Sequence, residues 1–226
     1  MTVFRAFKLR AIPQVSWSAP HPLTIRIPWV TWIPLLLGLA LFGLGEAMLV
    51  AAGVGVSPWT VLAQGVALTT TLSIGWASLL ISGVVLLIWI PLRQMPGIGT
   101  LCNAVIISAM LEGALPYLPR PDTVWSGVIM AALGILIIGV GSGLYLIANC
   151  GPGPRDGLMT GIQRRTGWPV AAIRGAIEVT VVSLGFILGG TVGVGTLMFA
   201  TGVGPAVALG LSIVGGLATR WDHRAR

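Results

Sequence analysis

The chain has 226 residues, of which 55% are hydrophobic and only 8% are charged, and its mean hydropathy is +0.95. Soluble domains carry about 25% charged residues, so this composition excludes a water-soluble globular protein and predicts an all-α integral membrane protein. The net charge of +7 does not indicate nucleic-acid binding, because the basic residues lie between apolar segments rather than in one patch. Cys102 and Cys150 lack the spacing of a zinc site or a disulfide framework and are expected to be packing residues.

A basic segment, 1–28, opens the chain and is expected to be a cytoplasmic tail. The apolar stretch that follows is too long for the hydrophobic region of a cleavable signal peptide, so we expect an uncleaved anchor. Six stretches approach or reach the roughly 20 residues needed to cross about 30 Å of hydrocarbon: 29–52, 75–92, 101–117, 124–148, 170–188 and 196–217. Two shorter helical stretches, 58–72 and 154–165, are expected to be re-entrant or to lie at the membrane interface.

The loop charges favour six crossings over eight. With six, the loops on the N-terminal side hold nearly all the arginines, and the opposite loops hold only Arg120, balanced by Asp122. Eight crossings would put Arg93 and Arg155 on the outer side. The positive-inside rule therefore predicts that both termini are cytoplasmic.

The chain also repeats itself at a spacing of 96 residues (193 − 97 = 96), as in the two runs 97–101 and 193–197. Most of the repeated residues are Gly and Pro. The matched pairs are Gly38 and Gly134, Gly43 and Gly139, Gly45 and Gly141, Gly55 and Gly151, Pro58 and Pro154, Leu62 and Leu158, and Gly65 and Gly161. Three spans in each repeat is an odd number, so repeat 1 (29–120) and repeat 2 (121–218) are expected to be inverted in the membrane, with a second basic tail at 219–226.

Four runs of the sequence resemble the YczE/YitT-like family of bacterial membrane proteins, most closely in its actinobacterial form. The runs are 55–59, 97–103, 151–159 and 189–196, and the resemblance extends over about residues 30–217. It implies a polytopic protein of the bacterial plasma membrane and lends no substrate. The first-half motif of the family resembles Pro-Trp-Asp, where this chain has Pro58-Trp59-Thr60. The carboxylate is present only in the second half, as Asp156, which puts a symmetric pair of acidic groups in doubt.

Glycine-rich turns open four of the predicted helices. Such openings offer free N–H groups and the positive end of the helix dipole, which meet anionic substrate groups in inverted-repeat transporters. Alternatively, these residues serve only helix starts and close packing. The substrate-binding candidates of this kind are Gly55, Pro58, Trp59, Thr60, Thr100, Gly151, Pro154 and Thr196.

Charged residues inside a membrane are costly, so each is a candidate functional residue. Arg174 and Glu178 are spaced i, i+4 and are expected to pair, either as part of a substrate site or as an ion pair that holds helices together. An alignment with a shorter spacing of 92 residues matches them to Ser82 and Leu86, so the pair would break the repeat.

Three more charged residues stand at informative places. Asp156 is favourable in the first turn of a helix, whereas Arg155 beside it needs a partner such as a substrate anion or a lipid headgroup. Glu46 lies deep in the first span, where it would serve either proton coupling or a hydrogen bond to a neighbouring helix.

The sequence contains no pattern of a catalytic site, a phosphate-binding loop or a metal site, so we expect no enzyme and no cofactor. It favours a small secondary transporter or channel for a small anion or zwitterion, with a central site between inverted repeats. The alternative is a non-transporting accessory or scaffold protein whose surface at 155–165 docks a protein or anionic lipid. The lipid bilayer is the expected partner, and Gly-rich faces would also allow a homodimer.

Overall fold

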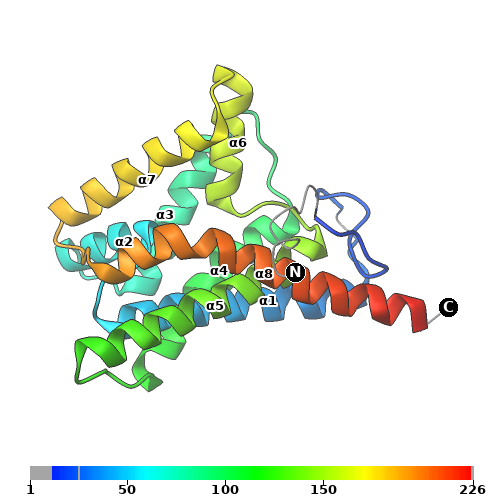
Figure 1. Ribbon diagram of the computed structural model, residues 1–226. Helices are drawn as coiled ribbons and strands as arrows, with labels where there is room; N and C mark the ends of the chain where they lie inside the picture. Colours follow the sequence, from blue (N-terminus) through cyan, green and yellow to red (C-terminus); the bar gives the residue numbers. More distant parts are fainter. Residues whose placement is uncertain (1–11, 25, 225–226) are drawn as a thin grey trace.

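The computed structural model describes residues 12–24 and 26–224, and within them the chain is all-helical (Figure 1). Apart from the 3-10 helix η2 (Leu115–Tyr117), the elements are α-helices. They are α1 (Trp29–Ala52), α2 (Pro58–Thr69), α3 (Ile74–Trp89), α4 (Ile98–Ala114), α5 (Val124–Ala148), α6 (Pro154–Thr166), α7 (Val170–Ile187) and α8 (Val194–Arg224). The all-α prediction is therefore confirmed.

Five helical segments are long and apolar enough to cross a membrane by themselves: α1, α4 with η2, α5, α7 and α8. The expected span at 75–92 is shorter than predicted, because the helix α3 ends at Trp89 and a turn with Arg93 at a positive φ of 54° follows. The helices α2 and α3 reach spanning length only together, and they are bent by 114° at the break between them. Figure 1 shows that α6 is steeply inclined to the long helices α5 and α8.

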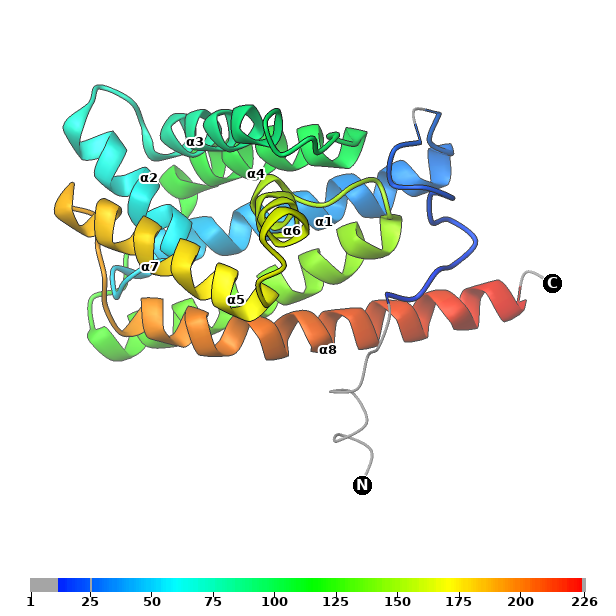
Figure 2. The ribbon, with the colours of Figure 1, turned by 90° about the horizontal axis from the view of Figure 1, so that it is seen from above.

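The long helices α1 and α5 form the centre of the fold and run antiparallel. Glycines bring their backbones together at two levels, where Gly38 faces Gly141 and Gly45 faces Gly134. A Cβ atom added to Gly38 would lie 2.7 Å from the carbonyl oxygen of Gly141, so a larger residue does not fit. The helix α4 packs on α1, and α8 packs on α5. Figure 2 shows that α1 begins, and α5 and α8 end, at the same end of the molecule.

Contacts between the two halves recur with the halves exchanged. Pro58 and Pro154 begin α2 and α6, and the starts of α3 and α7 and of α4 and α8 are likewise 96 residues apart. We call residues 96 apart equivalent. The N–H of Gly99 donates to the carbonyl of Cys150 at 2.8 Å, and the equivalent bond runs from Gly195 to Val54 at 2.8 Å. In the same manner, α2 packs on α7 and α6 packs on α3.

The described part of the N-terminal tail packs against the end of α5. The Ser18 hydroxyl donates to the carbonyl of Ile147 at 2.7 Å, and the Ala19 N–H donates to the carbonyl of Ala148 at 2.9 Å. The Asn149 side-chain amide donates back to the carbonyl of Ala19 at 2.8 Å. The tail therefore satisfies backbone groups at a helix end that α5 itself leaves unpaired. Residues 1–11 lie outside the described part of the chain.

Candidate functional site

A cavity of about 320 Å³ lies among all eight α-helices. Seven pairs of equivalent residues line it. The pairs are Pro58 and Pro154, Trp59 and Arg155, Ser78 and Arg174, Ser82 and Glu178, Asn103 and Phe199, Ile107 and Val203, and Ser108 and Gly204. The two halves thus contribute the same positions, but with different chemistry, to one cavity.

Two arginines and two carboxylates give the cavity wall a balanced charge. Arg174 Nε lies 2.8 Å from Glu178 Oε1, so the predicted i, i+4 pair forms. Its side chains are 51% and 26% exposed, because they stand at the open edge of the cavity. Among the described residues, no group of three or more His, Cys, Asp and Glu side chains gathers that could hold a metal ion.

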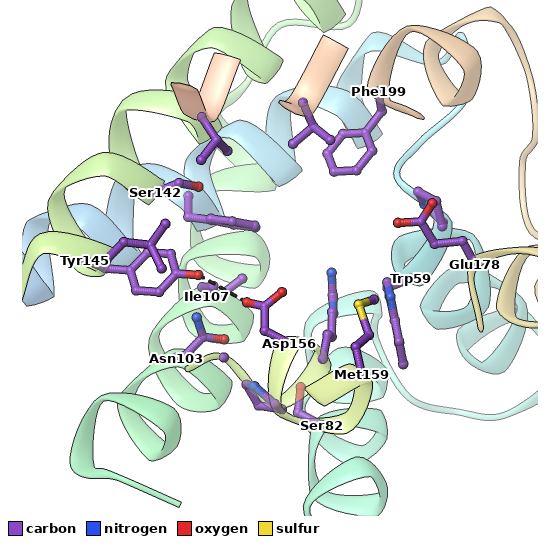
Figure 3. A pocket seen from close by; sticks show the side chains of 18 of the residues that line it. Trp59, Ser82, Asn103, Ile107, Ser142, Tyr145, Asp156, Met159, Glu178 and Phe199 are labelled. Atoms are coloured by element: carbon purple, nitrogen blue, oxygen red, sulfur yellow. Dashed lines mark hydrogen bonds between the residues drawn. The ribbon is translucent and has the colours of Figure 1, made fainter. Parts of the chain in front are cut away.

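The start of α6 brings Arg155 and Asp156 to the cavity. The Arg155 guanidinium carbon lies 5.1 Å from the centre of the Trp59 ring, which is a cation–π distance. Because Trp59 and Arg155 are equivalent, this contact lies where the two halves meet. Asp156 projects into the cavity, and the Tyr145 hydroxyl donates to its Oδ2 over a long 3.4 Å (Figure 3). Glu178 stands on another side of the same space (Figure 3).

The polar residues that sequence reasoning missed come mostly from the first half and from α5. They are Ser78, Ser82, Asn103, Ser108, Ser142 and Tyr145. Equivalence could have found three of them: at the constant spacing of 96, the candidates Arg174, Glu178 and Glu46 match Ser78, Ser82 and Ser142. The structure keeps that spacing at the starts of α3 and α7, so the shorter alignment that pairs Glu178 with Leu86 is wrong.

Glu46 and Thr60 do not line the cavity; they contact each other at the start of α2. The Glu46 carboxylate is 1% exposed, and its Oε2 accepts from the Ser57 hydroxyl at 2.8 Å and from the Thr60 hydroxyl at 2.7 Å. Its Oε1 is buried and has no hydrogen-bond partner among the described residues. The hydrogen bond to a neighbouring segment that the sequence suggested therefore forms; the proton-coupling role stays a prediction.

The remaining candidates join the two halves to each other rather than line the cavity. The Thr100 hydroxyl donates to the carbonyl of Pro152 at 2.7 Å and accepts from the Gly97 N–H at 3.2 Å. The Thr196 hydroxyl accepts from the Gly193 N–H at 3.2 Å. Gly55 and Gly151 adopt positive φ angles of 108° and 113°, where glycine is favoured. These four residues shape the loops from which α2 and α6 begin.

Comparison with known proteins places the chain among bacterial membrane proteins. Residues 29–211, which contain every residue of the cavity wall, match a family of unknown function, DUF6198. An uncharacterised protein of Haemophilus influenzae is 42% identical over 207 residues, which cover 92% of this chain and 94% of that protein. No solved structure matches the chain.

Two Bacillus subtilis proteins are also similar. The uncharacterised membrane protein YczE is 31% identical over 171 residues, which cover 75% of this chain and 80% of YczE. The uncharacterised protein YyaS is 27% identical over 167 residues, which cover 72% and 83%. The resemblance to YczE is thereby confirmed, and the chain belongs to the YczE-like family of membrane proteins described as DUF6198.

Proposed function

We propose that this chain is a small secondary transporter or channel of the bacterial plasma membrane, with the central cavity as its substrate site and no catalytic step. One observation carries the proposal: equivalent residues of the two halves line one cavity. Transporters built from repeats bind their substrates in this way, at the interface between the repeats.

We propose further that the halves are inverted repeats with both termini in the cytoplasm. The antiparallel packing of α1 and α5 supports this, because a two-fold exchange of antiparallel spans turns one half upside down in the membrane. The start of α1 and the end of α8 lie at one end of the molecule (Figure 2), and Arg26 and Arg220 stand in the segments that meet there. The loop between η2 and α5 holds Arg120 and Asp122, whose opposite charges cancel, as expected for a loop on the outer side.

The substrate that best fits the cavity is a small zwitterion, with a small anion as the next candidate. Binding pockets for small molecules have volumes of about 300–1,000 Å³, so this cavity of about 320 Å³ suits a small solute. Arg155 and Arg174 would bind an anionic group, and Asp156 would bind a cationic one. The serine side chains of the first half supply neutral donors and acceptors on the other side.

Glu46 would supply proton coupling. Its carboxylate is buried within the first span and has one oxygen without a hydrogen-bond partner among the described residues, as a carboxylate on a proton path would. Uptake driven by a pH gradient, and lost in Glu46→Gln, would support this role. Gradient-driven uptake that persists in Glu46→Gln would contradict it.

The first experiment is a thermal-stability panel on the detergent-purified protein with glycine, taurine, inorganic phosphate, choline and lipids. A ligand at a hundredfold excess over its dissociation constant stabilises the folded state by about 2.7 kcal/mol. Ligands that bind would then be tested for uptake into proteoliposomes. We expect Arg174→Ala and Asp156→Asn to abolish uptake and Arg164→Ala to preserve it, because Arg164 lies outside the cavity wall and contacts Gln94 instead. Normal uptake in the first two variants would contradict the site.

The accessory or scaffold alternative rests on the exposed basic end of α6. Arg164 and Arg165 occupy its last turn and are exposed. If this surface docks a protein or anionic lipid, then charge reversal at these two residues would disturb that association without altering any flux. A flat thermal panel, or shifts with anionic lipids alone, would favour this alternative. A homodimer in the bilayer is compatible with either function.

A further inference from the structure

Each of the helices α2 and α6 has a carboxylate and a hydroxyl near its N-terminus. The two groups occupy exchanged positions in the two halves. In the first half, a carboxylate on α1 (Glu46) accepts from a hydroxyl at the start of α2 (Thr60). The equivalent residues are Ser142 on α5 and Asp156 at the start of α6, so there the hydroxyl and the carboxylate have changed places. The start of α2 therefore has no carboxylate of its own, and Glu46 on α1 supplies the one that Thr60 contacts.

The two transposed pairs are in different states. The Glu46–Thr60 bond is formed at 2.7 Å and is buried. Among the described residues no Ser142–Asp156 bond is formed: Asp156 faces the cavity, and its Oδ2 accepts the long bond from Tyr145. One half is therefore closed around its carboxylate, and the other half is open.

Helix packing has the same asymmetry. In the first half α3 packs along α4, whereas the equivalent helices α7 and α8 make little or no contact with each other. Both α7 and α8 line the cavity, and the half-exposed Arg174 on α7 marks its open edge. The opening and the unbonded carboxylate thus belong to the same half.

We infer that Glu46 and Asp156 alternate at the cavity. In a second state the halves exchange conformations. Asp156 bonds Ser142 and α7 packs along α8, while the bonds of Glu46 to Thr60 and Ser57 break and Glu46 faces a cavity that opens between α3 and α4. Each state presents one carboxylate to a cationic ligand group. In a protein built from equivalent halves, the second state uses the packing that the first state already contains. The inference rests on the proposed transport function for its purpose.

The test measures conformation and needs no substrate, so its failure is distinct from failure of the transport proposal. Spin labels are attached to cysteines at two equivalent pairs of outward-facing positions, Leu80 with Val105 and Ala176 with Thr201. The background is Cys102→Ala, Cys150→Ala, checked by size-exclusion chromatography and thermal midpoint. Pulsed electron resonance in nanodiscs then gives both distance distributions. Two exchanging populations are expected in each pair.

Matched variants should shift these populations in opposite directions. Thr60→Val removes a bond present only in the observed state, so the second state should rise by roughly tenfold relative to the first. Ser142→Ala should lower it by a similar factor, and Thr60→Ser should restore the original ratio. The inference is overturned if both variants shift the populations in the same direction, if neither shifts them, or if only one population exists in every variant.

Discussion

The starts of α2 and α6 both have one carboxylate nearby, but it comes from a different position in each half. At α2 the carboxylate comes from the neighbouring span, as Glu46, and at α6 it comes from the helix itself, as Asp156. Both helices start with Pro, and each N-terminus has one acidic side chain beside its positive dipole end. The comparison shows that both halves place one acidic side chain at this helix start, although it comes from a different position in each.

A second exchange of this kind concerns size. The Trp89 ring of α3 covers Gly157 of α6, and at the equivalent contact Gly185 of α7 lies against the backbone of Val61 and Leu62 of α2. The large and small partners have changed places between the halves. At both contacts the glycine leaves no room for a Cβ atom and so lets the neighbouring helix approach closely.

The largest expected effect breaks this size pair. In Gly157→Val the new side chain would overlap the Trp89 ring, whose Nε1 also donates to the carbonyl of Pro154 at 3.0 Å. We expect a loss of about 3 kcal/mol or more in the free energy of unfolding and little folded protein after purification. The double variant Gly157→Val, Trp89→Gly reproduces the residues of the equivalent contact between Val61 and Gly185, and it should recover part of this loss. A single variant with a wild-type thermal midpoint would contradict the predicted overlap.

Removal of the acidic residue at α2 should have the next largest effect. Glu46→Leu leaves the hydroxyls of Ser57 and Thr60 without their buried acceptor, so we expect a loss of about 2 kcal/mol. The matched control is Ser142→Leu at the equivalent position, which removes no hydrogen bond found among the described residues. Thermal midpoints of the two variants are compared. Equal losses would show that volume, not the hydrogen bonds of Glu46, decides stability here.

The contact between the halves at Trp59 and Arg155 should contribute about 1 kcal/mol. A double-mutant cycle with Trp59→Leu and Arg155→Leu measures this coupling. Because the two positions are equivalent, the swap Trp59→Arg, Arg155→Trp should retain much of it. A coupling energy of zero would mean that Arg155 is free of Trp59 in the membrane.

The smallest stability effect is expected at the half-exposed pair of Arg174 and Glu178. An i, i+4 pair at an exposed site stabilises by less than about 0.5 kcal/mol. Glu178→Gln should therefore leave the thermal midpoint nearly unchanged while it alters ligand binding at the cavity. The equivalent substitution Ser82→Ala should also be stable. A large loss of stability in Glu178→Gln would assign the pair to helix packing instead of the site.

The positions of the helices could be predicted from sequence because they depend on local properties. Apolar length sets where a span can lie, and Gly and Pro set where a helix starts, so the spacing of 96 residues was visible without any contact between helices. Four cavity residues were also predicted from sequence, because charged side chains are costly inside a membrane and each is therefore a candidate functional residue. They are Arg155, Asp156, Arg174 and Glu178.

Only the tertiary structure decided which distant segments meet. Three contacts of this kind join residues far apart in sequence. Glu46 accepts a hydrogen bond from Thr60, α2 packs on α7, and the Thr100 hydroxyl donates to the carbonyl of Pro152 in the other half. The serines and Asn103 of the cavity wall have no distinctive local pattern, because a polar side chain in a span can face a neighbouring helix, lipid or a cavity. Composition and spacing determine the elements; the side on which each residue lies is set by packing among all eight helices.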